Sequence, residues 1–187
     1  MNSVVSQLNS ILLFLCLSPV CLALPSDLSG TWTMPCDRGL RKEQVIQDNI
    51  ATTTEFFHQD KDCTQESFRF KTVGRLAFNA NEPFWIDFTY SAVELTVFVP
   101  QVVSDFNMRS VCGFQDWQAG TAKVITGLKC ALFNVNKPTQ IPTVTDLKFG
   151  IYKIEEGHLY YGQLTQEKNG SSAEKRPDMF APDYFVK

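Results

Sequence analysis

Two stretches in the middle of the chain alternate apolar and polar residues one by one. In Ser67–Thr72 both Phe side chains fall on one face, and Arg69 and Lys71 fall on the other. Phe84–Tyr90 repeats the pattern: Phe84, Ile86, Phe88 and Tyr90 share one face, opposite Asp87 and Thr89. Because successive side chains of a β-strand point to opposite faces, this period of two predicts half-buried strands.

The alternation then slips by one residue. After Ser91 and Ala92 the apolar positions continue from Val93 to Val99 in the opposite phase. A slip of this kind predicts a β-bulge or a bend within one long strand. Pro100 has no N–H to donate to a ladder, so we expect the strand to end there.

Further strands are predicted on both sides of this region. Ile50–His58 is rich in Thr and Phe, which favour strands. Leu147–Ile154 and Leu159–Leu164 flank a short turn containing glycine and predict a hairpin. Ser104–Lys123 has turn residues but no regular period, so we interpret it as a loop or a bent strand.

Strands at this spacing, with turn signals between them, favour an all-β fold: an antiparallel sandwich or barrel. A barrel leaves no exposed strand edge. The interior of an eight-stranded barrel is either packed solid or holds one small ligand, and composition does not choose between these.

The first 23 residues are typical of a secretory signal peptide. Ile11–Leu22 is an apolar run too short to span a bilayer comfortably, and cleavage is expected after Ala23. Cys21 is an alternative lipoprotein cysteine, although Val20 before it is bulky for that signal. We therefore expect residues 24–187 to form one β domain that is secreted, periplasmic or extracellular and does not span a membrane.

Four cysteines follow this signal: Cys36, Cys63, Cys112 and Cys130. An even number in an exported chain predicts two disulfides, for which three pairings exist. We favour Cys36–Cys63 and Cys112–Cys130, because each pair closes a local loop of moderate length. In the chain-entropy model, each disulfide would stabilise the fold by roughly 3 kcal/mol. A zinc site is the alternative, but no CxxC spacing occurs and the chain has two His.

Three short motifs are spread along the chain. Gly30-Thr31-Trp32 resembles the Gly-x-Trp signature of lipocalins, in which the Trp closes one end of the barrel. Thr145-Asp146 resembles the Thr-Asp motif, and Arg176 falls where lipocalins carry an Arg that packs over the Trp. The resemblance implies a barrel closed by Gly30, Trp32 and Arg176.

A larger set of positions forms a second pattern: Gly30, Thr31, Trp32, Cys36, Phe56, Asp60, Cys63, Phe68 and Gly74. This pattern resembles the adenomatosis polyposis coli down-regulated (APCDD) domain and its bacterial lipocalin-like relatives. Two later segments, Cys112–Gly120 and Leu159–Gly162, also look like these relatives. The resemblance implies a lipocalin-like barrel or half-open barrel with a cavity for a lipid or acyl chain, and it supports the Cys36–Cys63 pairing.

These observations lead to a function hypothesis: an exported protein that buries a lipid or other small hydrophobic ligand. The alternative is a solid-cored module acting through its surface, as an inhibitor, adhesin or envelope component. If a cavity exists, we expect one face of the alternating strands to line it, with Trp85 in place of Ile86 should the opposite face point inward. The expected lining residues are Phe68, Phe70, Phe84, Ile86, Phe88 and Tyr90.

Other functional classes are disfavoured. A net charge of −3 without a basic stripe argues against nucleic-acid binding. No nucleophile elbow or His-Glu-x-x-His helix occurs, so we expect neither an enzyme nor a cofactor. His58, Asp60 and Asp62 are a conceivable metal site, but a polar loop tip explains them better.

Overall fold

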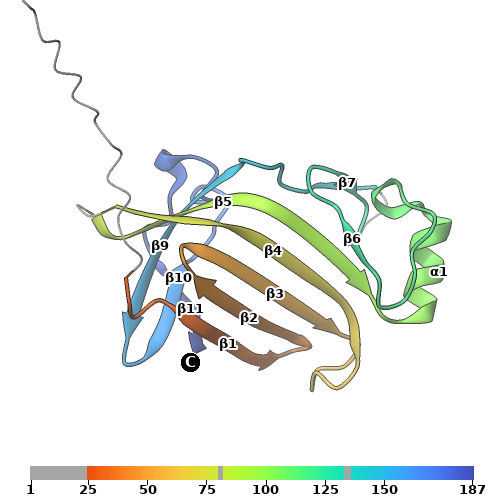
Figure 1. The fold of residues 1–187 in the computed structure, drawn as a ribbon, viewed down its shortest axis with the longest axis horizontal. Coiled ribbons are helices and arrows are strands. Elements are labelled where there is room, and N and C mark those ends of the chain that lie inside the picture. The colour runs from red at the N-terminus through yellow and green to blue at the C-terminus, as the bar shows by residue number, and fades with distance from the viewer. Residues whose placement is uncertain (1–24, 80–81, 133–135) are drawn as a thin grey trace, which may run out of the picture.

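The chain folds into a closed antiparallel β-barrel of eight strands (Figure 1). The computed structural model describes residues 25–79, 82–132 and 136–187, so the predicted signal peptide and Cys21 lie outside the described residues. Neighbouring strands pair in chain order, β4 pairs with β5, and β11 returns to β1 through Thr33 and Val186. The barrel strands are β1 (Gly30–Asp37), β2 (Leu40–Gln47), β3 (Ile50–His58), β4 (Glu66–Asn79), β5 (Glu82–Val97), β9 (Leu147–Glu155), β10 (His158–Gly162) and β11 (Phe180–Val186). The prediction of an all-β barrel is confirmed.

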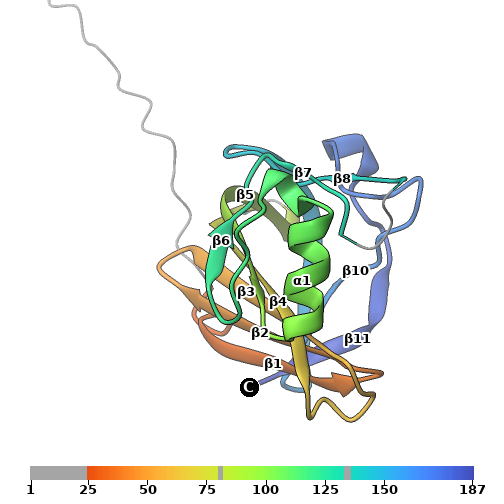
Figure 2. The ribbon, with the colours of Figure 1, turned by 90° about the vertical axis from the view of Figure 1, so that its right-hand side faces the viewer.

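Between β5 and β9 the chain leaves the barrel, and we call this segment the insertion. Its β6 pairs with the outer end of β5, and β7 and β8 form a separate two-stranded sheet. Viewed from that end, α1 lies in front of the barrel strands (Figure 2). Its elements are α1 (Pro100–Met108), the 3₁₀ turn η1 (Val111–Gly113), β6 (Ala122–Val124), β7 (Lys129–Cys130) and β8 (Thr139–Gln140). A second 3₁₀ turn, η2 (Ala173–Lys175), lies between β10 and β11.

The interpretation of Ser104–Lys123 as loop or bent strand is wrong at its start, because that region begins inside α1. Pro100 ends the strand as expected, but it also opens the helix, where its missing N–H costs nothing. With only nine residues and one buried side chain, Phe106, the helix is too short to produce a clear period. No helix in the described part of the chain is long and apolar enough to cross a membrane.

The predicted slip in the long strand is a β-bulge. Val73 pairs with Ala92, but the next pair joins Gly74 to Tyr90, so Ser91 is the extra residue. A Cβ on Gly74 would lie 2.4 Å from the Thr89 carbonyl oxygen, so only glycine fits beside the bulge. The bulge allows one strand to serve both the barrel and the insertion.

Two further predictions are confirmed. β9 and β10 form the expected hairpin, with Glu156 and Gly157 both at positive φ in its turn. The disulfides join Cys36 to Cys63 and Cys112 to Cys130. The first ties β1 to the β3–β4 connection, and the second ties η1 to β7.

The described residues form two hydrophobic cores, each around a buried tryptophan. The Trp32 core fills the end of the barrel near the start of β1 and contains Leu28, Trp32, Ile46, Ala51, Leu76, Ile86, Leu159 and Phe185. The Trp117 core joins the insertion to the outer half of β5 and contains Val93, Leu95, Val97, Phe106, Val111, Cys112, Trp117, Ile125, Cys130 and Ile141.

Candidate ligand-binding cavity

A cavity of about 320 Å³ lies inside the barrel, between the two cores. Its wall includes Leu76 and Ile86, which belong to the Trp32 core, and Phe88, which packs against that core. Tyr90, also on the wall, packs against the Trp117 core. Six strands contribute lining residues: β2, β3, β4, β5, β9 and β10. The barrel is therefore closed at its ends but not packed solid in the middle.

The cavity reaches the surface where β9 and β10 separate. Their pairing stops at Tyr152 and Tyr161, and beyond that point β9 pairs instead with the β10–β11 connection. There the Phe149 N–H donates to the Gly170 carbonyl at 2.9 Å. Leu164, which is 56% exposed, stands at this opening and lines the cavity. A ligand chain longer than the cavity would leave past this side chain.

A buried hydrogen-bond chain crosses one side of the cavity. The Tyr161 hydroxyl donates to Oε1 of Gln44, and Nε2 of Gln44 donates to Oγ1 of Thr53 at 2.9 Å. Burial raises the pKa of Tyr161 well above its ordinary value, so the hydroxyl keeps its proton at neutral pH. These two hydrogen bonds join β10, β2 and β3. They hold the amide of Gln44, a residue that is 8% exposed, in one orientation.

Two charged side chains reach the cavity wall, and each already has a partner. Glu55 forms an ion pair with Lys42 at 2.6 Å across β2 and β3. The Lys148 ammonium donates to the Asn169 carbonyl, and burial lowers the pKa of this lysine. The wall is thus mostly apolar, with a few convergent polar groups, which is typical of small-molecule sites.

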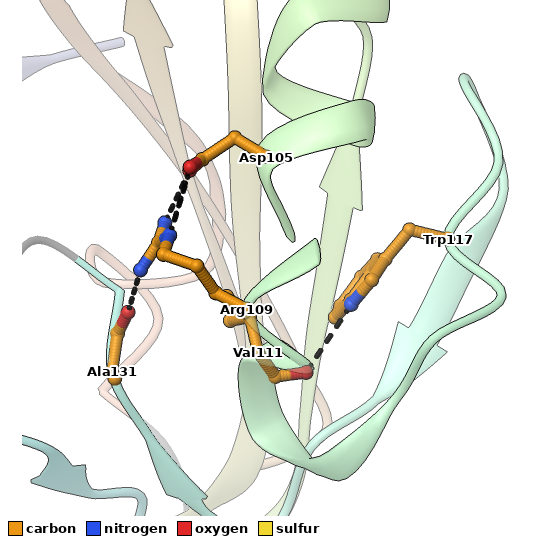
Figure 3. Close-up of polar contacts among 5 residues, drawn as sticks. All are labelled: Asp105, Arg109, Val111, Trp117 and Ala131. Carbon is orange, nitrogen blue, oxygen red and sulfur yellow. Dashed lines mark hydrogen bonds and ion pairs between the residues drawn. The ribbon is translucent and has the colours of Figure 1, made fainter. Parts of the chain in front are cut away.

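The insertion closes the barrel end opposite Trp32, and polar contacts fix its shape (Figure 3). The Arg109 guanidinium pairs with Asp105 on α1 and donates to the Ala131 carbonyl at 2.8 Å. The Trp117 indole N–H donates to the Val111 carbonyl at 3.2 Å. These contacts join the helix, η1 and the segment after β7 into one unit over the barrel end.

The predicted lining residues are divided among three places. Ile86, Phe88 and Tyr90 lie on the cavity wall. Phe68 and Phe70 share this inner face, but they lie near the start of β4, beyond the cavity. There they pack against the Trp117 core. The structure places Phe84 outside the cavity, 55% exposed and edge-on to Phe180 at 6.4 Å.

The reason for this division is strand length. β4 and β5 have 14 and 16 residues, so both ends of the alternating stretch extend beyond the cavity. The inner face is the one that we expected: Ile86 points inward, and Trp85 lies on the outside against Arg176.

The predicted closure of Trp32 by Arg176 is wrong. Arg176 lies on the outside of the barrel, 4.2 Å above the Trp85 ring, with Nη1 2.6 Å from the Asp87 carboxylate. The Lys187 ammonium instead lies 4.7 Å over Trp32 and donates to the Asp27 carbonyl at 2.7 Å. The β10–β11 connection packs on β9 and so carries Arg176 away from Trp32, while the C-terminus of β11 ends beside it.

The other predicted closure residues do lie at this end. Gly30 starts β1 at a φ of 121°, which is unfavourable for other residues. Trp32 is 1% exposed, and its indole N–H donates to the Leu28 carbonyl at 2.8 Å. The short segment before β1 thus folds over the tryptophan and covers it.

The loop with His58, Asp60 and Asp62 has a structural explanation. The Asp60 carboxylate accepts backbone N–H bonds from Asp62, Thr64 and Gln65 at 2.8–3.2 Å. Its pKa is lowered, foremost by the Thr64 bond, as expected for a carboxylate that caps a turn. In the described ranges, no group of three His, Cys, Asp or Glu side chains is arranged to hold a metal ion.

Sequence reasoning missed the polar residues of the cavity, foremost Gln44, Thr53, Thr72 and Tyr161. The alternation in Leu40–Gln47 was available as a signal, since Gln44 falls in phase with Ile46 on the inner face. No family model matches the sequence, and no curated protein matches it. The fold and this cavity therefore carry the functional argument.

Proposed function

We propose that this chain is an exported, lipocalin-like protein of the APCDD type that binds a lipid or other small hydrophobic ligand in its barrel. The cavity between the two cores is the observation that carries this proposal. Two disulfides support export, because such bonds persist in oxidising compartments. The predicted signal peptide points the same way.

The driving force for binding is burial of apolar surface, at roughly 25 cal/mol per Å². Leu76, Ile86 and Phe88 supply that surface from adjacent strands. A cavity of about 320 Å³ is near the lower limit for ligand sites, roughly 300–1,000 Å³.

Native mass spectrometry of the protein purified from its own host tests the proposal directly. We expect a bound species that is released on denaturation, together with uptake of a fluorescent fatty acid by the emptied protein. Absence of both would contradict the proposal.

A matched pair of variants shows whether binding takes place in the barrel. Thr53→Phe fills the cavity from β3, whereas Thr54→Phe places the same ring on the outer face of the same strand. We expect Thr53→Phe to weaken uptake at least 10-fold and Thr54→Phe to leave it unchanged. Equal effects of the two changes would place the binding site elsewhere.

A further inference from the structure

Three residues with hydroxyl groups line the cavity from the adjacent strands β3, β4 and β5, and we call them the hydroxyl cluster: Thr53, Thr72 and Tyr90. Thr53 and Thr72 lie directly opposite each other on β3 and β4. Opposed residues on one face of an antiparallel pair bring their Cβ atoms to about 5 Å. Tyr90 follows on the adjacent strand β5, opposite Gly74, which is two residues beyond Thr72.

The direction of the buried hydrogen-bond chain fixes the role of Thr53. Tyr161 donates to Gln44, and Gln44 in turn donates to Thr53, so the Thr53 oxygen is an acceptor within the chain. Its hydroxyl hydrogen must therefore point away from Gln44. Among the described residues no acceptor receives a hydrogen from Thr53 or Thr72, which makes both hydroxyls available to a molecule in the cavity.

The charges around the hydroxyl cluster favour an uncharged acceptor. Glu55 lies on the same face of β3, two residues from Thr53, and its carboxylate is already paired with Lys42. Burial, then the charges of Asp146 and Glu55, raise the pKa of Tyr90, so a negative field reaches its hydroxyl. The same negative charges would repel a ligand carboxylate placed there. A carbonyl or ether oxygen carries no net charge, so this repulsion does not apply to it.

We propose that the ligand carries an uncharged oxygen acceptor, such as a ketone, ester or ether, to which the hydroxyls of Thr53 and Thr72 donate. The hydrocarbon part then lies against Leu76, Ile86 and Phe88, and any remainder leaves past Leu164. This inference rests on the proposed function and specifies its ligand class. Tyr161 and Gln44 also line the cavity, and their hydrogen bonds orient the Thr53 hydroxyl, so in this interaction they are positioning residues.

Isothermal titration calorimetry with two molecules of the same shape tests this inference. 2-Octanone has the acceptor oxygen, and in 2-methyl-1-octene a methylene group replaces that oxygen. We expect Thr53→Val to weaken binding of 2-octanone about 3- to 10-fold, the value of one net hydrogen bond, and to leave the alkene unaffected. Thr54→Val, on the outer face of the same strand, should change neither affinity.

Conservative variants separate recognition from folding. Thr53→Ser keeps the hydroxyl and should retain ketone binding, and Thr72→Val should repeat the selective loss. Tyr161→Phe frees the Gln44 amide, so it should also lower ketone affinity more than alkene affinity. Circular dichroism of each variant identifies any that fails to fold.

The possible outcomes distinguish the two proposals. If wild-type protein binds both molecules and Thr53→Val weakens both equally or neither, the acceptor inference is overturned while the binding function stands. If octanoate binds more tightly than 2-octanone and Lys148→Met abolishes that advantage, the cavity selects an anion, and the inference is wrong. If the wild type takes up none of the three, the proposed function fails, and this inference fails with it.

Discussion

Each end of the barrel is closed around a buried tryptophan, but the chain builds the two ends differently. Trp32 and Trp117 are 1% and 2% exposed, and each indole N–H donates to a backbone carbonyl. Residues of the Trp32 core are spread over the chain from Leu28 to Phe185. Residues of the Trp117 core lie between Val93 and Ile141, and a disulfide between Cys112 and Cys130 is part of the core itself.

The difference separates long-range from local stabilisation. The Trp32 core forms only when first and last strands meet, so its loss should affect the whole barrel. The Trp117 core is built from one segment and the strand that it leaves, so it can open while the barrel stays folded. The cavity lies between them and has one wall in contact with each.

Removing each tryptophan should have the largest effect and expose this difference. Trp32→Ala is expected to lower the free energy of unfolding by about 3–5 kcal/mol, measured by urea denaturation and circular dichroism. Trp117→Ala removes a side chain of the same size, but its effect should be concentrated in the insertion. Hydrogen exchange should then rise in residues 98–132 and stay slow in β2 and β3. Equal acceleration in the barrel would contradict the division into a long-range and a local core.

The buried disulfide should come next in size. Cys112→Ala together with Cys130→Ala removes a bond that closes a separation of 18 residues, at a cost of about 2–4 kcal/mol. The matched control is the same double change at Cys36 and Cys63, which lie outside both cores. Only the double change at Cys112 and Cys130 should expose the Trp117 core. This exposure would be detected as a red shift of tryptophan fluorescence. A comparable shift from the control would show that the insertion is not an independent unit.

A single amide joins α1 to the Trp117 segment. Asn107 donates to the Trp117 carbonyl at 3.1 Å and accepts from the Trp117 N–H at 2.6 Å. Asn107→Ala leaves two partly buried backbone groups without this partner and should cost about 1–3 kcal/mol in thermal unfolding. Gln115→Ala is the control, because that amide is exposed and donates to the Ser110 hydroxyl, outside the Trp117 core. Equal losses of stability from the two changes would show that the Asn107 amide is not a specific link between α1 and the Trp117 segment.

The smallest effect is expected at the Trp32 end. Lys187→Met removes the ammonium over the indole and its bond to the Asp27 carbonyl, at a cost of about 0.5–1 kcal/mol. Urea denaturation of this variant beside Lys129→Met, an exposed lysine of the insertion, provides the comparison. A loss above about 2 kcal/mol would make the C-terminus a principal part of the closure.

Local patterns in the sequence predicted the barrel well. The alternation in Ser67–Thr72 and Phe84–Tyr90 identified the inner face, and the phase slip located the bulge at Ser91. The cysteine spacing favoured the observed pairing. These features depend on neighbours in the chain or on loop closure, which a sequence displays directly.

Contacts between distant residues could not be predicted in the same way. Tyr161 and Gln44 are 117 positions apart, and their hydrogen bond exists only because the barrel closes. The position of Arg176 was misjudged because chain order does not reveal on which side of the wall a long connection runs. The helix α1 was missed because nine residues are too few to establish a period.

The insertion leaves and rejoins the barrel along one strand, β5, at two positions about 20 Å apart. The chain leaves β5 after Val97 and returns at Asp146, whose carbonyl accepts the Tyr90 N–H at 3.0 Å. Because both junctions lie on β5, the segment between them can be lengthened, shortened or exchanged without redirecting the other strands. The same barrel could thus be given a different cover, and a different ligand entrance, by recombination of one cassette between Val97 and Asp146.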